Sequence, residues 1–318
     1  MKRLFKISFL IIAVLISNIS FNQCKADSII TYRIVGGVSE IATIEYFKRD
    51  VNDSIISQDF IQFQNGKKAS ASQNTNEWKK VKGKWVLEKH SATWAAEELR
   101  IIPVTKSYST YDKKLRLLSE VHQNFKLIGE QSNYINQSKV DYVYSKTGQL
   151  INQFYSVWNP AKSVWQNQSN IAHSYNEFNF KKETITSTYD TLQNFWTNSR
   201  KNEFGYDSLQ KLTETITYQY IKDVWVPHSR VEYGVDTTSN MKYSVVQKWN
   251  GEKSKWINEF YYVMQLDETG KTKIEVHLSW AKTDWKIDLT VYYIYNEQGI
   301  MKQILNDKKQ VIVEWFCD

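Results

Sequence analysis

Histidines are the first side chains in this 318-residue chain that could bind a metal ion or move a proton. There are five: His90, His122, His173, His228 and His277. No two of them have the H-x-x-H or H-E-x-x-H spacing that places two zinc ligands on one helix. A site assembled from residues distant in the sequence would leave no such pattern, so that alternative stays open. The spacing itself predicts no metal site and no cofactor.

Other catalytic patterns are also missing from the sequence. It has no G-x-S-x-G motif, no catalytic Cys–His arrangement and no glycine-rich phosphate loop, and most of its 11 glycines mark turns. Glu97 and Glu98 form the one pair of adjacent carboxylates that attracts attention, but neighbours on a helical turn do not face one site. We therefore expect no catalytic residues and no enzyme. A hydrolase with two carboxylates across a cleft is the remaining alternative, because the sequence cannot show their separation.

Aromatic side chains are the other candidates, and they recur with a period of about 30 residues. A turn residue recurs at Asp112, Ser145, Asn176, Asp207, Asp236, Asp267 and Asn296. An aromatic residue stands thirteen residues after each of the first six, and another stands eleven residues before each of the last six. The twelve aromatics are Phe125, Tyr134, Trp158, Trp165, Tyr189, Trp196, Tyr220, Trp225, Trp249, Trp256, Trp280 and Trp285. The gap within a pair is five, seven or nine residues, so the repeat length changes only in even steps.

Each repeat has the alternating pattern of a β-hairpin. In the unit from Asp267, polar residues alternate first with Ile274, Val276, Leu278 and Trp280, and then with Trp285, Ile287, Leu289, Val291 and Tyr293. An even change in length keeps both aromatics of a pair on one face of the sheet. The opposite face is expected to be wetted, and in the unit from Asn176 it carries Thr184, Thr186, Thr188, Lys201 and Glu203. The predicted fold class is all-β, an antiparallel meander of hairpins, and the pattern does not decide between a barrel, a sandwich and a ribbon.

The aromatic rows allow two interpretations. They could stack on sugar rings or receive a protein partner, or they could form the sheet's own core. Recurrence in every unit favours the structural interpretation, because a binding site normally uses one or two special positions. A ligand contact is expected where the units differ, at Trp94 or at the hairpin tips 159–164 and 250–255.

Residues 27–110 are β-rich but less regular than the repeat domain of residues 111–318. Gly36-Gly37 and Asn65-Gly66 predict hairpin turns. Trp78 and Trp85 lie seven residues apart and predict one degenerate repeat. Residues 94–100 (WAAEELR) have helical propensity and predict a helical turn that connects the two regions.

The first 26 residues have the features of a secretory signal peptide: a basic start, an apolar run over residues 7–16 and small residues near Ala26. The apolar run is too short to cross a bilayer. Cleavage after Ala26 is expected, and the rival interpretation is a lipoprotein with its lipid anchor at Cys24. After cleavage only Cys317 would remain, so a disulfide within the chain is not expected. The predicted location is periplasmic, cell-surface or extracellular, without a transmembrane segment.

The formal net charge of +7 does not indicate nucleic-acid binding. Lys2, Arg3, Lys6 and Lys25 lie in the predicted signal peptide, where there is no acidic residue. Without those four, 37 basic residues face 34 acidic ones, a net charge of +3. Because the remaining charges are interleaved along the predicted strands, no basic patch is expected and no nucleic-acid partner.

The repeat is similar to the tryptophan-rich repeats of secreted Bacteroidetes proteins and, more distantly, to the tyrosine–aspartate repeats of Rhs-type shells. The residues that carry the resemblance are Tyr144 with Gly148, Tyr175-Asn176, Tyr206-Asp207, Asp267 with Gly270, and Asn296 with Gly299. Ser145, Asn179 and Gln210 depart from the pattern, as does the last unit. The resemblance covers residues 111–318 and implies a secreted all-β protein, with no catalytic residues to transfer.

Taken with the export signal, these patterns predict an exported, non-enzymatic repeat protein that binds a glycan or a protein. The alternative is a structural or envelope-assembly scaffold in which the aromatic array has no ligand.

Overall fold

The computed structural model describes residues 28–36, 38–51, 54–95, 100–128, 131–296 and 301–316. The predictions for the signal peptide, Cys24, Glu97-Glu98 and Cys317 lie outside these residues. The strands are β1 (Ser28–Val35), β2 (Val38–Arg49), β3 (Ile55–Gln64), β4 (Lys67–Val81), β5 (Lys84–Ala95), β6 (Arg100–Tyr111), β7 (Leu117–Ile128), β8 (Gln131–Tyr144), β9 (Leu150–Asn159), β10 (Val164–Tyr175), β11 (Lys181–Asp190), β12 (Phe195–Tyr206), β13 (Leu212–Ile221), β14 (Val224–Asp236), β15 (Met241–Asn250), β16 (Lys255–Leu266), β17 (Thr272–Ala281), β18 (Asp284–Tyr295), β19 (Met301–Leu305) and β20 (Val311–Phe316).

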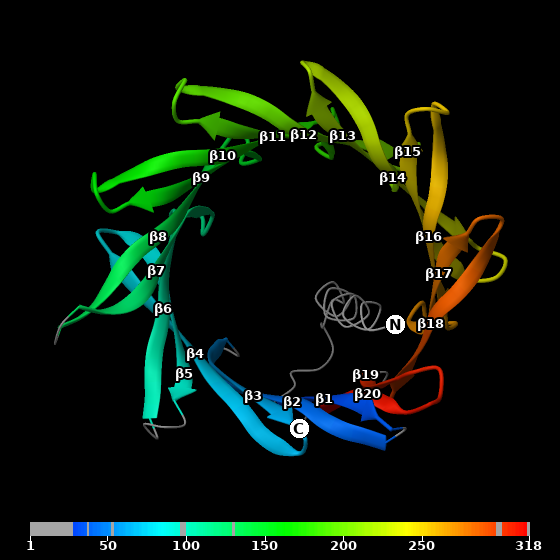
Figure 1. Ribbon diagram of the computed structural model, residues 1–318, viewed down its shortest axis with the longest axis horizontal. Helices are drawn as coiled ribbons and strands as arrows, with labels where there is room; N and C mark the ends of the chain where they lie inside the picture. The colour runs from blue at the N-terminus through cyan, green and yellow to red at the C-terminus, as the bar shows by residue number, and fades with distance from the viewer. Residues whose placement is uncertain are drawn as a thin grey trace.

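These strands form one closed antiparallel barrel, in which every strand pairs with the next along the chain (Figure 1). The ring closes where β1 pairs with β20. The predicted all-β meander is therefore confirmed, and the structure decides its closure in favour of a 20-stranded barrel. With a strand spacing of about 4.8 Å and a tilt of about 40°, such a ring is roughly 40 Å across.

Successive turns lie at opposite ends of the barrel because successive strands run in opposite directions. The tip end carries the hairpins β1–β2, β3–β4 and so on to β19–β20, and Figure 1 shows many of these hairpins leaning outward from the ring. The base end carries the turns that the recurring Asp, Asn and Ser residues begin.

Four of the base-end turns, those that begin at Asp112, Asn176, Asp207 and Asp267, share one hydrogen-bonding pattern, and the turn at Ser145 has part of it. In the turn at Asp207, its side-chain oxygen accepts hydrogen bonds from the backbone N–H groups of Leu209 and Lys211, at 2.9 and 2.8 Å. The fourth residue of the turn adopts a positive φ, 92° at Gly148 and 60° at Gln210. Glycine takes that conformation without strain, so Gln210 fits the turn at some cost in free energy.

A β-bulge near the tip of each repeat hairpin changes which side chains share a face. In the six hairpins from β7–β8 to β17–β18, one residue of the second strand has no partner across the ladder, three positions after the tip aromatic. These bulge residues are Gln137, Gln168, Ser199, His228, Glu259 and Asp288. A bulge reverses the alternation below it. Repeat lengths that differ only by even numbers constrain how far the hairpins differ in length. They do not reveal an extra residue that one strand of every hairpin contains.

The bulge makes two of the predicted faces wrong. Leu289, which pairs with His277, lies on the face opposite Trp285, and Val291 and Tyr293 follow it there. Conversely, Lys201 pairs with Ile185 and therefore shares the face of the tip aromatics, as Glu203 also does. The sheet thus does not have one aromatic face and one wetted face along its whole height.

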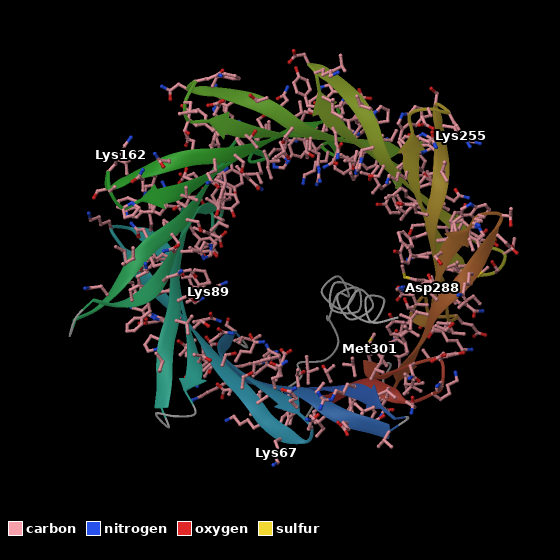
Figure 2. The ribbon with its side chains drawn as sticks, in the orientation of Figure 1. Lys67, Lys89, Lys162, Lys255, Asp288 and Met301 are labelled. Atoms are coloured by element: carbon pink, nitrogen blue, oxygen red, sulfur yellow. The ribbon has the colours of Figure 1, made fainter. Side chains whose placement is uncertain are left out.

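Lys89 and Met301 point into the ring in Figure 2 and identify its inner face. Lys89 pairs with Ser107, and Ser107 pairs with His122. Phe125 lies three residues beyond His122 on the same strand, so its side chain points outward. The tip aromatics therefore lie on the outer face.

One prediction for the N-terminal region is wrong, and a second is tested only at its two ends. Trp78 and Trp85 flank a base-end turn, so they lie at the opposite end of the barrel from the tip aromatics and do not form a degenerate repeat in phase with the others. Trp94 lies at the end of β5 and pairs with Ile101 on β6, where a helical connector was expected. Residues 96–99 lie outside the described residues.

Apolar burial concentrates at the closure of the ring, which we call the seam (β18, β19, β20 and β1). Val291, Tyr293, Ile304 and Val313 form a buried cluster there, with exposed fractions of 5%, 7%, 2% and 1%. The backbone ladder at the seam is short, since β1 and β20 pair over four residues and β19 and β20 over three. Side-chain packing therefore supplements a short ladder where the barrel closes.

Candidate functional site

Six aromatic pairs lie on the outer face near the tips. Their members are directly opposite each other across the hairpin: Phe125 and Tyr134, Trp158 and Trp165, Tyr189 and Trp196, Tyr220 and Trp225, Trp249 and Trp256, and Trp280 and Trp285. The ring centroids within a pair are 4.8 to 5.5 Å apart, with tilted or edge-to-face geometry. All twelve side chains are half-buried. They are therefore neither a closed core nor a fully exposed platform.

Several of these rings also contact the preceding hairpin. The ring centroids of Trp285 and Tyr261 are 5.4 Å apart, and Lys201 Nζ lies 5.5 Å from the centroid of Trp225. Aromatic and cation–π contacts of this kind contribute about 0.5–1.5 kcal/mol each. These contacts give the tip aromatics a structural role, because they fix one hairpin against the next.

A row of polar side chains lies directly below the aromatic pairs on the same face. In four hairpins an asparagine Oδ1 accepts a hydrogen bond from a Gln or Ser side chain on the facing strand. The donor–acceptor pairs are Gln123–Asn136 at 2.8 Å, Ser156–Asn167 at 3.4 Å, Ser187–Asn198 at 3.0 Å and Gln247–Asn258 at 2.9 Å. Tyr218 faces Pro227 at this level in β13–β14, and Leu278 faces Ile287 in β17–β18. We use the name aromatic–amide belt for the aromatic pairs of β7–β12 together with the asparagines below them and the Gln or Ser side chains that donate to those asparagines. Sequence reasoning missed the amides, although Asn136, Asn167 and Asn198 recur every 31 residues.

Trp94 and the predicted tip segments are placed as follows. Trp94 occupies the tip position of β5–β6, and on the facing strand, three residues after Ile101, a bulge leaves Val104 without a ladder partner. At the tip of β9–β10, Asn159 Oδ1 accepts a hydrogen bond from the backbone N–H of Lys162 at 3.1 Å. Asn250 does the same for Lys253 at 2.9 Å. Both tips are thus closed by their own asparagines and extend outward, as Lys162 and Lys255 show in Figure 2.

A charged cluster on the outer face joins β4, β5 and β6. Glu88, whose side chain is 8% exposed, forms ion pairs with Lys79 at 2.9 Å and with Lys106. His90 Nε2 lies 2.9 Å from the same carboxylate. Burial by itself would raise the pKa of Glu88, but the hydrogen bonds from Lys106 and Lys79 outweigh it and lower the pKa to about 2. A carboxylate held ionised among cations is suited to joining strands and not to accepting a proton at neutral pH.

A histidine–carboxylate–tyrosine arrangement lies on the inner face, on β17 and β18. Glu275 Oε1 is 2.8 Å from His277 Nε2, and Tyr293 Oη donates a hydrogen bond to Glu275 Oε2 at 2.5 Å. Burial, together with the Glu275 carboxylate, raises the pKa of Tyr293. The three residues are 3%, 6% and 7% exposed, so no substrate reaches them in this conformation.

The remaining histidines do not assemble a site among the residues that the structure describes. No group of three His, Cys, Asp or Glu side chains there could hold a metal ion. Burial, followed by the charge of Lys181, lowers the pKa of His173. A shallow depression lined by residues such as Asp59, Gln73 and Thr93 lies on β3, β4 and β5. No helix of the described ranges is long and apolar enough to cross a membrane.

The sequence matches no known protein family and no curated protein. Among solved structures, a protein of unknown function from Bacteroides fragilis is 16% identical, with a TM-score of 0.34 over 38% of this chain and 89% of that chain. A DUF3836 family protein from Bacteroides vulgatus is 20% identical, with a TM-score of 0.23 over 30% of this chain and 89% of that chain. A porin-like protein from Bacteroides vulgatus is 8% identical, with a TM-score of 0.26 over 93% of this chain and 99% of that chain. Similarities this low transfer no function, and the resemblance to tryptophan-rich repeats stays a prediction.

Proposed function

We propose that this protein is an exported, non-catalytic barrel that acts as a scaffold in the bacterial envelope. The observation that carries the proposal is the closed ring, in which side-chain contacts on the outer face join several hairpins to their neighbours. Trp285 contacts Tyr261 of the preceding hairpin, and Glu88 joins three strands through Lys79 and Lys106. A barrel whose repeats are joined by such contacts can remain rigid under mechanical force.

The charge distribution favours a barrel that stands in water. A barrel embedded in lipid presents an apolar band about 25 Å tall on its outer face. Here the outer face carries Glu88, Lys201 and Arg230 at mid-strand positions. Each Lys or Arg at a bilayer midplane costs about 2–4 kcal/mol. The inner face of the described strands also carries charged residues, Lys89 and Glu275, so it is no better suited to contact with lipid. We therefore propose a periplasmic or cell-surface location.

A second candidate function is ligand binding by the aromatic–amide belt. The observation that favours it is the combination of half-exposed rings with polar side chains below them, since ligand sites combine aromatic surface with a few oriented polar groups. This candidate and the scaffold are compatible, because a scaffold needs a surface by which it attaches.

Cell fractionation tests the scaffold proposal. The protein should leave the cytoplasm, sediment with the envelope and be released by urea or high salt without detergent. Chemical cross-linking in intact cells should capture it with envelope components. A freely soluble monomer in the culture fluid would refute the scaffold, and a protein that only detergent extracts would refute its aqueous location.

A further inference from the structure

We propose that the aromatic–amide belt binds one strand of a neutral, linear, β-linked polysaccharide laid across the three hairpins of β7–β12. This proposal rests on the second candidate function and names its ligand. It is independent of whether the barrel is anchored in the envelope.

The asparagines of the belt are held in one orientation. Asn136, Asn167 and Asn198 each use Oδ1 to accept a hydrogen bond from the facing strand. Among the described residues, no protein acceptor is assigned to their Nδ2 groups. Asn167 is exposed and the other two are half-buried, so solvent reaches this row. Each hairpin therefore offers one oriented N–H donor to a ligand hydroxyl or carbonyl oxygen.

An aromatic pair lies above each asparagine, and the pair above Asn167 offers the clearest surface for a sugar ring, because Lys106 contacts Tyr134 and Phe154 contacts Trp196 from the preceding hairpins. Trp158 and Trp165 meet edge to face, with centroids 5.1 Å apart and ring planes at 67°. In that geometry the ring that contributes its edge keeps its own faces clear of its partner. The C–H face of a β-linked pyranose packs on such a ring, while its equatorial hydroxyls remain free for hydrogen bonds.

The spacing of the hairpins suits a linear polymer. Neighbouring hairpins are two strands apart, so their equivalent residues are separated by about 10 Å. That separation is close to the length of one disaccharide in an extended β-1,4-linked chain. Alternate sugars of such a chain present the same face, so each hairpin would bind an equivalent sugar. Three hairpins span roughly 30 Å and would engage about six sugars.

The absence of charge along the bulges of the belt favours a neutral polymer. The bulge residues of these hairpins are Gln137, Gln168 and Ser199, and none of them carries a charge. Binding of a polyanion relies on several unpaired cations along its path. The lysines beside the belt, Lys106, Lys139 and Lys201, are ion-paired with Glu88, Asp141 and Glu203. The amide row stops at β13–β14, where Tyr218 faces Pro227. The isolated amide pair of β15–β16 thus has no amide neighbour on either side.

Calorimetric titration of the mature chain with chitohexaose and cellohexaose tests the proposal. At least one hexasaccharide should bind, and its disaccharide should bind at least about tenfold more weakly, because it engages one hairpin instead of three. Failure of both hexasaccharides to bind at millimolar concentration would overturn the proposal while leaving the fractionation test of the scaffold untouched. Binding of a polyanion such as heparin in preference to both would also overturn it.

Matched variants separate binding from stability. N167A should weaken hexasaccharide binding about 3- to 10-fold, the effect of one lost hydrogen bond. N258A removes the equivalent cross-strand bond from the isolated hairpin, so it should lower the melting temperature by a similar amount and leave affinity unchanged. Equal losses of affinity in the two variants would show that the asparagines act only through the fold, and would refute the proposed site.

Discussion

Replacing Glu88 with glutamine should destabilise the barrel at neutral pH and have a smaller effect at pH 3. The carboxylate is 8% exposed and bound to Lys79 and Lys106 on the neighbouring strands. Its pKa falls from 4.5 to about 2 in the folded chain. At 1.36 kcal/mol per pKa unit, this shift corresponds to about 3 kcal/mol at pH 7, as an upper limit.

The sign of the pH dependence follows from the lowered pKa. The ionised form is favoured by folding, so the contribution is complete above about pH 5 and is lost as the pH falls toward 2. At pH 3 it should be roughly 1 to 1.5 kcal/mol. Urea unfolding of the wild-type chain and E88Q at pH 7 and pH 3 measures both differences.

Glu77 provides a matched control for this experiment. Its side chain contacts the same Lys79 at 3.0 Å but is 61% exposed. An exposed ion pair contributes at most about 1 kcal/mol. E77Q should therefore change the free energy of unfolding little at either pH. Equal effects of E88Q and E77Q, or an E88Q effect that does not decrease at pH 3, would refute the assignment of Glu88 as the charge that joins these strands.

Three further predictions concern the seam, the bulge and the base-end turns. I304A should lower the free energy of unfolding by about 2–5 kcal/mol and I304V by about 0.5–1.5 kcal/mol, since Ile304 is 2% exposed at the seam, and denaturant titration checks the order. Deletion of Ser199 should impair folding far more than S199A, because it reverses every side chain below the bulge, as circular dichroism and thermal melting would show. D207A should cost about 1–2 kcal/mol through the loss of its two accepted hydrogen bonds, whereas D207N should retain most of the stability, and a thermal melt of both variants separates the two outcomes.

Local chemistry explains which parts of the fold and site were predictable. Alternating side chains and turn residues such as Asp207 act over a few residues, so hairpins and aromatic pairs such as Trp158 and Trp165 follow from spacing alone. The bulge at Ser199 was not predictable in the same way, because a single extra residue in one strand looks like any other polar residue. As a result, Lys201 was assigned to the wrong face, and Asn198 was not recognised as a neighbour of the aromatic pair.

The N-terminal errors have a related cause. Trp78 and Trp85 have the spacing of a repeat pair, but spacing does not state at which end of the barrel a turn lies. The two-residue turn at Lys82-Gly83 lacks the Asp or Asn that begins most later base-end turns, so the phase of Trp94 was lost. The pairing of Trp94 with Ile101 shows that Trp94 lies at the tip end of its hairpin. Such a pairing depends on two strands, so the spacing of residues along one strand does not reveal it.

By itself, the sequence determined the antiparallel hairpins and the aromatic pair at each tip, because these depend on side-chain alternation and short-range turn geometry. Only the tertiary structure decided that the meander closes, that the aromatics lie outside the ring and that an amide row lies below them. Those features depend on which edges meet and which way the sheet curves. Closure joins β1 to β20 across almost the whole chain, and no local pattern encodes a contact between residues that distant.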